Sequence, residues 1–233
     1  MAPSLIVRFR RKMRLIKTRK QIAKGENHEI GWDLSTVHEY WRKRDKHDEK
    51  TPFGFAGPMG SNEFKAIYFS QLVNRLGISK EDSFLELGPS AGFVLSDLYK
   101  NEYHNLSAIE INPKALIMMK ELFPETYNGC KLINGTFEEI LPSIDDNMYS
   151  VIFSMGVLMH VHPSSNFIFE HIARISKKHI IVIEEENAIY NRIFPRNYKK
   201  IFENLGFKQI LCEMTGKKIQ NYVNWPCRVF QKV

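Results

Sequence analysis

From residue 83 onward, short apolar segments alternate with stretches in which apolar residues recur three or four positions apart. Short runs rich in β-branched residues predict strands, and the wider spacing predicts helices. We expect strands at residues 83–87, 106–111, 131–134, 150–154, 179–184, 207–213 and 222–231. Helices are expected at residues 92–99, 113–122, 166–175 and 198–205. This alternation indicates βαβ units, a parallel sheet and right-handed crossovers.

The N-terminal pattern is different. Within residues 4–24, apolar residues follow each other at helical spacing and Lys or Arg fills most other positions, which predicts a basic amphipathic helix. We treat residues 1–24 as a basic arm. The formal net charge of +7 belongs to this arm, which holds nine of the 33 basic residues and none of the 26 acidic ones. The rest is near neutral, which argues against a broad nucleic-acid-binding face.

Residues 25–61 are predicted to form a linker and lid region. Ser35 is expected to cap a helical stretch that contains Tyr40 and Trp41. Residues 51–61 carry two prolines and three glycines, which predicts a loop with the glycines that a lid hinge uses. An aromatic patch packed on the sheet is the alternative to a lid. A helix at 62–76 is expected to end at Gly77.

The length of 233 residues suits one α/β domain with a short appendage. The three cysteines form no CxxC pair, so neither a disulfide framework nor a zinc site is expected. No apolar run is long enough to span a bilayer, and arginines interrupt the apolar residues at the N-terminus. We therefore expect a cytoplasmic protein.

Residues 84–92, FLELGPSAG, join the first predicted strand to a helix. In doubly wound sheets a ligand lies outside the carboxyl ends of the strands, and glycine in this turn lets it approach the backbone. A dinucleotide fingerprint from Gly88 would need glycine where Ser90 and Phe93 stand. Pro89 also lacks a backbone N–H for a pyrophosphate. The sequence therefore argues against a dinucleotide site.

An acidic-x-Gly-x-Gly-x-Gly spacing fits better, with Glu86, Gly88 and Gly92 in place. It departs only at Ser90. Glu110 follows Glu86 by 24 residues and ends the second predicted strand. A carboxylate there can accept hydrogen bonds from both hydroxyls of a ribose, whereas a solvated glutamate is the alternative.

Two later segments follow strands in the same way. In NGTFEEILP, residues 134–142, the Thr136 hydroxyl and the Phe137 backbone N–H are candidates to contact an adenine ring. The fourth strand ends near Ser154, and the residues after it are expected to line the reaction cleft.

The segments ELGPSAG, AIEINP, NGTFEEILP and VIFSMGVLMHVHP resemble, in order, the motifs of class I methyltransferases that use S-adenosylmethionine (SAM). The resemblance covers roughly residues 62–232. It implies a Rossmann-like α/β fold with a seven-stranded, mostly parallel sheet, an antiparallel last strand and flanking helices. Residues 62–233 are accordingly predicted to form the SAM-binding domain.

The resemblance also implies which residues contact the cofactor SAM. They are Glu86, Gly88, Pro89, Gly92, Glu110, Ile111, Thr136, Phe137, Ser154 and Met155. Ser90 departs from the glycine usual at its position, and Ser150 departs from a common aspartate.

GVLMHVHP and the later EEEN are similar to methylases associated with biosynthesis of bacterial surface sugars such as pseudaminic acid. This shorter resemblance points to O-methylation of a sugar, a glycan or another small metabolite. No metal is expected, because no acid stands at Ser154 to partner the carboxylates of residues 184–186. Cys227 is expected to be a packed thiol, and no motif for methylation of DNA base amines follows the fourth strand.

His160 is the preferred candidate for a general base, and Glu184 or Glu185 is the alternative. His160 could instead only shape the pocket. Proximity and alignment alone could also supply much of the rate, since SAM is already activated.

The basic arm leaves three hypotheses open. It could bind an anionic membrane surface, at the inner face of the membrane, or steer RNA or DNA, or be a plain tail. One alternative function is an RNA or DNA methyltransferase that uses the basic arm, and another is a non-catalytic binding module with the same fold.

Overall fold

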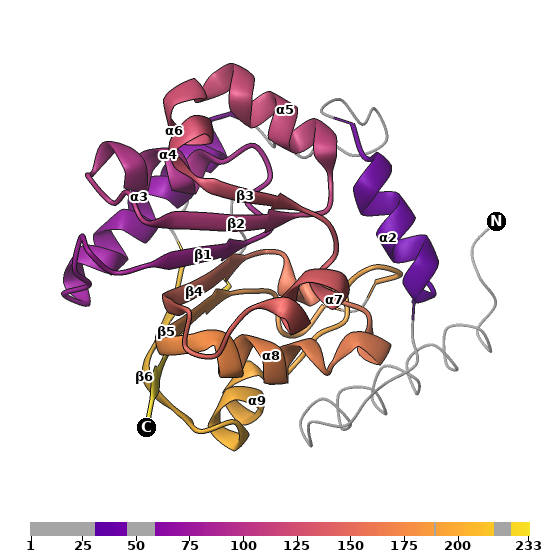
Figure 1. Ribbon diagram of the computed structural model, residues 1–233. Coiled ribbons are helices and arrows are strands. Elements are labelled where there is room, and N and C mark those ends of the chain that lie inside the picture. The colour runs from indigo at the N-terminus through magenta and orange to yellow at the C-terminus, as the bar shows by residue number, and fades with distance from the viewer. Residues whose placement is uncertain (1–30, 46–58, 189, 217–224) are drawn as a thin grey trace, which may run out of the picture.

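Seven strands form one sheet in the order β3-β2-β1-β4-β5-β7-β6 (Figure 1). Their bounds are β1 Phe84–Leu87, β2 Leu106–Glu110, β3 Lys131–Asn134, β4 Tyr149–Met155, β5 Ser176–Ile183, β6 Phe207–Met214 and β7 Pro226–Lys232. Strands β1 to β5 run parallel, and β7 pairs antiparallel with both β5 and β6. The predicted seven-stranded, mostly parallel sheet with an antiparallel last strand is confirmed.

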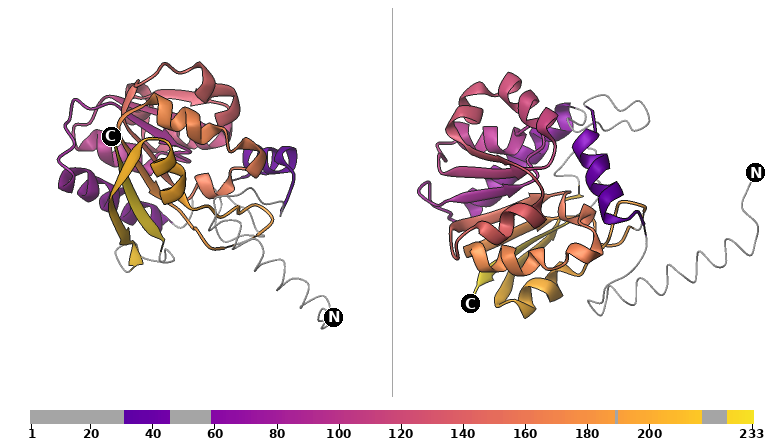
Figure 2. Two further views of the ribbon diagram at one scale, coloured as in Figure 1. Left: turned by 90° about the horizontal axis from the view of Figure 1, so that it is seen from below. Right: turned by 45° about the vertical axis from the view of Figure 1, so that its right-hand side comes forward.

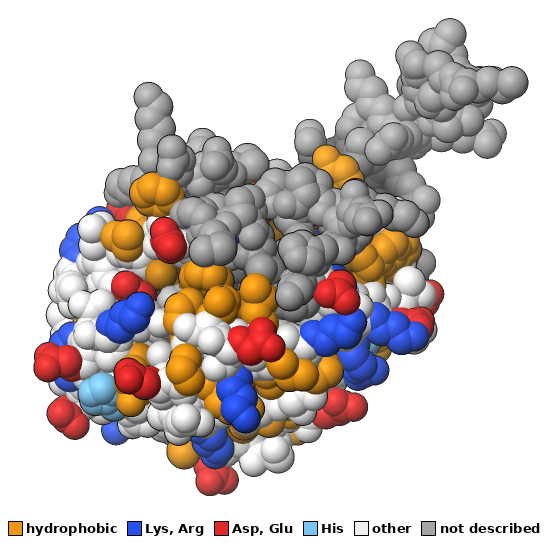
Figure 3. All heavy atoms as spheres, turned by 90° about the horizontal axis from the view of Figure 1, so that it is seen from above, with side chains coloured by type: hydrophobic (Ala, Val, Ile, Leu, Met, Phe, Trp, Pro, Cys, Tyr) orange, Lys and Arg blue, Asp and Glu red, His pale blue; other side chains and the backbone are white. Residues whose placement is uncertain are grey.

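This computed structural model describes residues 31–45, 59–188, 190–216 and 225–233. The basic helix predicted at residues 4–24 and most of the loop predicted at 51–61 lie outside these ranges, so the hypotheses on the basic arm stay predictions. No helix in the described part of the chain is long and apolar enough to cross a membrane. On the face that Figure 3 shows, basic and acidic side chains are interspersed in the described part, as expected for a near-neutral body.

Helices cover both faces of the sheet (Figures 1 and 2). On one side lie α3 Met59–Arg75, α4 Phe93–Lys100, α5 Pro113–Leu122 and α6 Pro124–Gly129. On the other lie α7 Phe137–Ile140, α8 Ile168–Ile175 and α9 Tyr198–Asn204. Helix α2, Leu34–Lys43, stands outside both layers, beside the carboxyl ends of the parallel strands.

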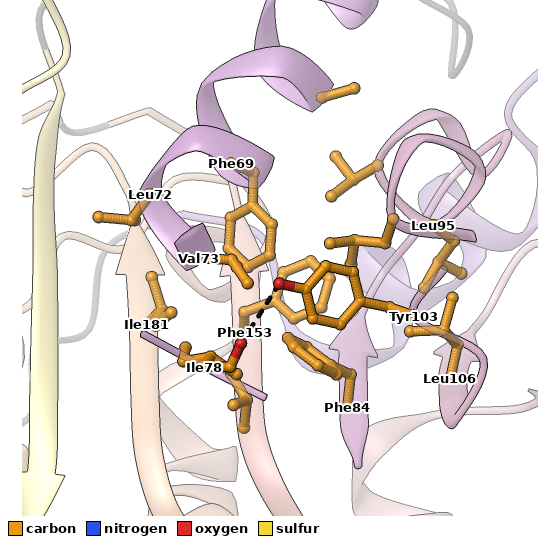
Figure 4. Close-up of a cluster of buried hydrophobic side chains, with 14 of the residues drawn as sticks. Phe69, Leu72, Val73, Ile78, Phe84, Leu95, Tyr103, Leu106, Phe153 and Ile181 are labelled. Carbon is orange, nitrogen blue, oxygen red and sulfur yellow. Dashed lines mark hydrogen bonds between the residues drawn. The ribbon is translucent and has the colours of Figure 1, made fainter. Parts of the chain in front are cut away.

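Because successive side chains of a strand point to opposite faces of the sheet, the strands contribute to two separate hydrophobic cores. On the α3 side, Phe69 stacks on Phe153 at 4.1 Å between ring centroids, with Phe84 nearby (Figure 4). In the same core the Tyr103 hydroxyl donates to the Ile78 carbonyl oxygen over 3.3 Å. Leu85 and its neighbours on the other face pack against α8 and α9. The sheet is therefore buried on both faces, as a parallel sheet must be.

Several predicted boundaries were wrong. Ser35 does not cap α2, because Asp33 has the extended backbone of a cap and its carboxylate accepts from the Thr36 N–H over 2.9 Å. Helix α3 starts at Met59 rather than at residue 62, since packing of its later turns outweighs the weak helix propensity of Gly60. The short helices α6 and α7 were not predicted, because a single turn carries little periodicity.

Candidate functional site

The backbone of the turn between β1 and α4 lies against the loop that follows β4. Gly88 has a φ of 73°, and a Cβ added there would lie 2.7 Å from Val157 Cγ1. Only glycine therefore fits at this position. Gly92 caps α4 with a φ of 77°, and its missing Cβ makes room for Met119 of α5.

Ser90, in the place of the expected middle glycine, has the left-handed backbone conformation that glycine would adopt, with a φ of 54°. Its N–H donates to Glu110 Oε2 over 2.9 Å. The serine thus preserves the shape of the turn, at the cost of a conformation that L-residues rarely adopt. The turn therefore forms although Ser90 replaces the expected glycine.

Glu110 ends β2 and lies at the carboxyl end of the sheet. It is buried, and Oε1 accepts from the Asn112 N–H over 2.9 Å while Oε2 accepts from Ser90. A carboxylate offers about four acceptor positions, so each oxygen retains capacity for a ligand hydroxyl. Burial raises the pKa of Glu110, and its backbone hydrogen bonds oppose this rise.

Glu86 lies near the end of β1 and is fully surrounded. Its Oε2 is buried without a hydrogen-bond partner in the described part of the protein. Burial and the neighbouring Glu110 charge raise the pKa of Glu86 to about 8. A buried acceptor without a donor is costly, which points to a ligand that supplies one.

Thr136 caps the short helix α7. Its hydroxyl accepts from the Glu139 N–H over 3.2 Å, and the Glu139 carboxylate accepts from the Thr136 N–H over 3.1 Å. The Phe137 N–H stands at the first position of α7, where helix geometry provides no acceptor. The predicted adenine contacts of both residues stay predictions.

Glu184 does not have the position that its predicted role as a base requires. Its carboxylate is buried beneath the loop after β4 and does not line the cavity described below. It accepts from the Ser154 hydroxyl and from the N–H groups of Val157, Leu158 and Met159, at 3.1 to 3.2 Å for the three N–H groups. This geometry argues against Glu184 as a base, a role that stays a prediction, and Ser154 likewise bonds Glu184 and does not line the cavity.

Arg196 holds the same loop from the other side. Its buried guanidinium donates to the carbonyl oxygens of Leu158 and Val161 and to Asn166 Oδ1. Glu184 thus binds the N–H groups of residues 157–159, and Arg196 binds carbonyls on both sides of His160. Two opposite charges fix the turn that carries His160.

His160 stands on this turn, at the boundary of the cavity. Its Nδ1 donates to the Arg192 carbonyl oxygen over 2.6 Å, so Nε2 keeps its lone pair. The ring lies against Trp41 of α2, with 4.4 Å between centroids. Burial, together with the nearby charges of Arg192 and Arg44, lowers the pKa of His160 to about 3, so the ring is neutral at physiological pH.

Helix α2 bridges the two ends of this region. Its His38 lies 3.1 Å from Glu138 of α7, and the Arg44 carbonyl accepts from Asn112 Nδ2 over 2.9 Å. The Trp32 N–H donates to the Asn191 carbonyl over 2.6 Å. The region predicted as a lid therefore contributes a helix that lies across the site.

A cavity of about 430 Å³ lies between α2 and the carboxyl ends of β1, β2 and β4. Its volume is within the range of small-molecule sites, roughly 300 to 1,000 Å³. Nine of the twelve predicted site residues line it: Glu86, Gly88, Pro89, Glu110, Ile111, Thr136, Phe137, Met155 and His160. Gly92, Ser154 and Glu184 do not.

Other lining residues were not predicted from the sequence. They include Val37, His38, Arg44, Asn62, Lys65, Arg192 and Trp225. Arg192 and Trp225 come from connections around β5 and β7 that show no motif. The aromatic pair at 40–41 was the one signal for the α2 side, and of the two Trp41 lines the cavity.

Known proteins share a domain and the fold with this chain. Residues 85–183 match the family model described as a methyltransferase domain. The search of curated proteins gave no significant match.

Among solved structures, the fold is similar to magnesium protoporphyrin IX methyltransferase from Synechocystis with bound SAH, with a TM-score of 0.66 and 12% identity over 86% of this chain and 100% of that one. A SAM-dependent methyltransferase from Aquifex aeolicus has a TM-score of 0.56 and 14% identity, covering 86% of this chain and 98% of its own. At such identities the likeness shows a shared fold.

Proposed function

We propose that this chain, whose residues 85–183 match a methyltransferase domain, is a class I SAM-dependent methyltransferase that binds SAM in this cavity and methylates an oxygen of a small molecule. The acceptor we propose is a sugar, a glycan or another small metabolite. The observation that carries the proposal is that Glu86, Glu110 and His160 line the same cavity.

The residues of the cavity fit SAM, the cofactor of this family. Glu110 has two backbone donors and spare acceptor capacity, which suits two ribose hydroxyls. Glu86 presents a buried oxygen without a donor, which suits a cationic group. The missing Cβ of Gly88 leaves the turn close to the loop at Val157.

SAM supplies an activated methyl group, so the protein needs chiefly to hold, align and shield the reacting groups. Helix α2 lies over the cavity and is held by contacts at both ends. Glu184 and Arg196 fix the loop opposite the glycine turn. The acceptor is therefore held between α2, the 157–161 turn and the cofactor.

Replacing Glu110 with alanine is expected to weaken SAM binding by at least about 100-fold. Two hydrogen bonds to a charged acceptor are lost, each worth about 1.5 to 3 kcal/mol. The measurement is calorimetric titration of the purified protein with SAM and with SAH.

Glu121→Ala is the matched control, because it removes an exposed glutamate of α5 that does not line the cavity. SAM affinity should change little in this variant. If the folded wild-type protein does not bind SAM, the proposed function is wrong and a fold-only binding module takes its place.

His160 is proposed to accept the acceptor hydroxyl proton at Nε2 as the methyl group arrives. The Arg192 carbonyl fixes the tautomer, and the Trp41 ring fixes the plane of the imidazole. A neutral histidine held in this way acts as a hydrogen-bond acceptor at all pH values at which the protein would work.

His160→Asn retains a donor for the Arg192 carbonyl and removes Nε2. We expect kcat to fall about 100-fold, in the range that general bases contribute, while SAM affinity stays within about twofold. Because the pKa of His160 is about 3, the wild-type rate should show no histidine step between about pH 5.5 and 7.5. The assay uses the best acceptor from a panel of sugars and sugar nucleotides. A kcat within twofold of wild type would assign His160 a shaping role only.

A further inference from the structure

Acidic and basic side chains both line the cavity, and Lys65 lies near Glu86 at its cofactor end. The acids are Glu86 and Glu110, proposed to hold SAM, and Glu138, which lies 3.1 Å from His38. Basic side chains at Arg44 and Arg192 line the part near His160. Within the described residues, this part of the cavity contains no further carboxylate. Its potential is therefore positive.

Arg192 is a cation in this part of the cavity that forms no ion pair with the described residues. Its guanidinium lies 4.9 Å from the centre of the Tyr40 ring, and its Nε is buried without a hydrogen-bond partner among the described residues. Across the same residues it makes no ion pair, whereas Arg228 pairs with Glu186 at 2.7 Å. Buried donors without acceptors are rare and costly, so an acceptor is expected to come from outside the chain.

Trp41 presents a second such donor. Its indole Nε1 is buried and has no partner in the described part of the chain. The ring lies 4.4 Å from His160 and 5.0 Å from Tyr40. Since His160 also bonds the Arg192 backbone, a closed set of contacts joins Trp41, His160, Arg192 and Tyr40.

From this arrangement we propose that the acceptor substrate carries an anionic group, a carboxylate or a phosphate, that binds Arg192 and the Trp41 indole N–H beside His160. The inference rests on the proposed function and adds the substrate class. Guanidinium and indole N–H groups donate and cannot accept, so they bind a group with acceptor oxygens, and the guanidinium charge favours an anion over a neutral or cationic group. An anion there would also offset the Arg192 charge that lowers the pKa of His160 and make this residue a better proton acceptor.

The test titrates the SAH-saturated protein with three probes of similar shape: benzoate, phenyl phosphate and the neutral benzamide. We expect at least one anion to bind saturably and benzamide to bind at least tenfold more weakly. The better of the two anions distinguishes a carboxylate acceptor from a phosphate acceptor. Arg192→Gln should weaken that anion at least tenfold and leave SAH affinity unchanged.

Lys177→Gln is the control, because it removes the same charge from an exposed position near the start of β5, at the opposite end of the strand from the cavity. It should leave all three titrations unchanged. Equal binding of benzamide and the anions, no saturable anion binding, or an Arg192→Gln variant with wild-type anion affinity would each overturn the inference. Because SAH binding is measured in the same samples, its loss would instead report failure of the proposed function.

Discussion

Glu184→Ala is expected to lower the free energy of unfolding by about 3 to 5 kcal/mol, the range for removing one partner from a buried charged network. Four donors, the Ser154 hydroxyl and three backbone N–H groups, would lose their acceptor in a site without water access. Arg196 would also remain buried without the negative charge opposite it. Denaturant unfolding monitored by circular dichroism measures the change.

The neighbouring Glu185→Ala provides the matched control. Glu185 is partly exposed and accepts from the N–H groups of Asn187 and Ala188 in a surface turn, so its loss should cost about 1 kcal/mol or less. Equal effects of the two substitutions would refute the assignment of Glu184 as the anchor of the 157–161 turn. An effect on turnover without an effect on stability would restore Glu184 as a catalytic candidate.

Gly88→Ala is expected to cost about 3 kcal/mol or more and to abolish measurable SAM binding. The left-handed backbone costs an L-residue about 1 to 2 kcal/mol, and the new Cβ would lie 2.7 and 2.8 Å from the two Val157 methyl carbons. The clash pushes apart the two loops that face each other across the cavity. Thermal unfolding and SAM titration measure the two effects.

Gly77→Ala separates the two causes, because Gly77 has a φ of 65° and open space around its missing Cβ. It should show only the backbone cost, about 1 to 2 kcal/mol, with normal SAM binding. Val157→Ala in the Gly88→Ala background should recover part of both losses. If Gly77→Ala and Gly88→Ala cost the same, close approach at Val157 plays no part.

The order of strands and helices along the chain was predictable from the sequence, because strand and helix periods differ and β-branched runs mark buried strands. The residues at the proposed cofactor end of the cavity were equally predictable. The positions that require a glycine, or an acid at the end of a strand, lie within local sequence motifs. Gly88 and Glu110 are examples, and both line the cavity. The exact helix caps were less predictable, as Asp33 shows, because neighbouring polar residues compete for one cap.

Only the tertiary structure decided what Glu184 and Arg196 do. At the sequence level Glu184 is an acid at a strand end, like Glu110, and both looked like candidates for chemistry. The difference is that three N–H groups of a distant loop converge on Glu184, whereas Glu110 keeps acceptor capacity toward a cavity. Whether a buried polar group finds hydrogen-bond partners depends on segments that only the fold brings together, and these partners cannot be predicted from the local sequence.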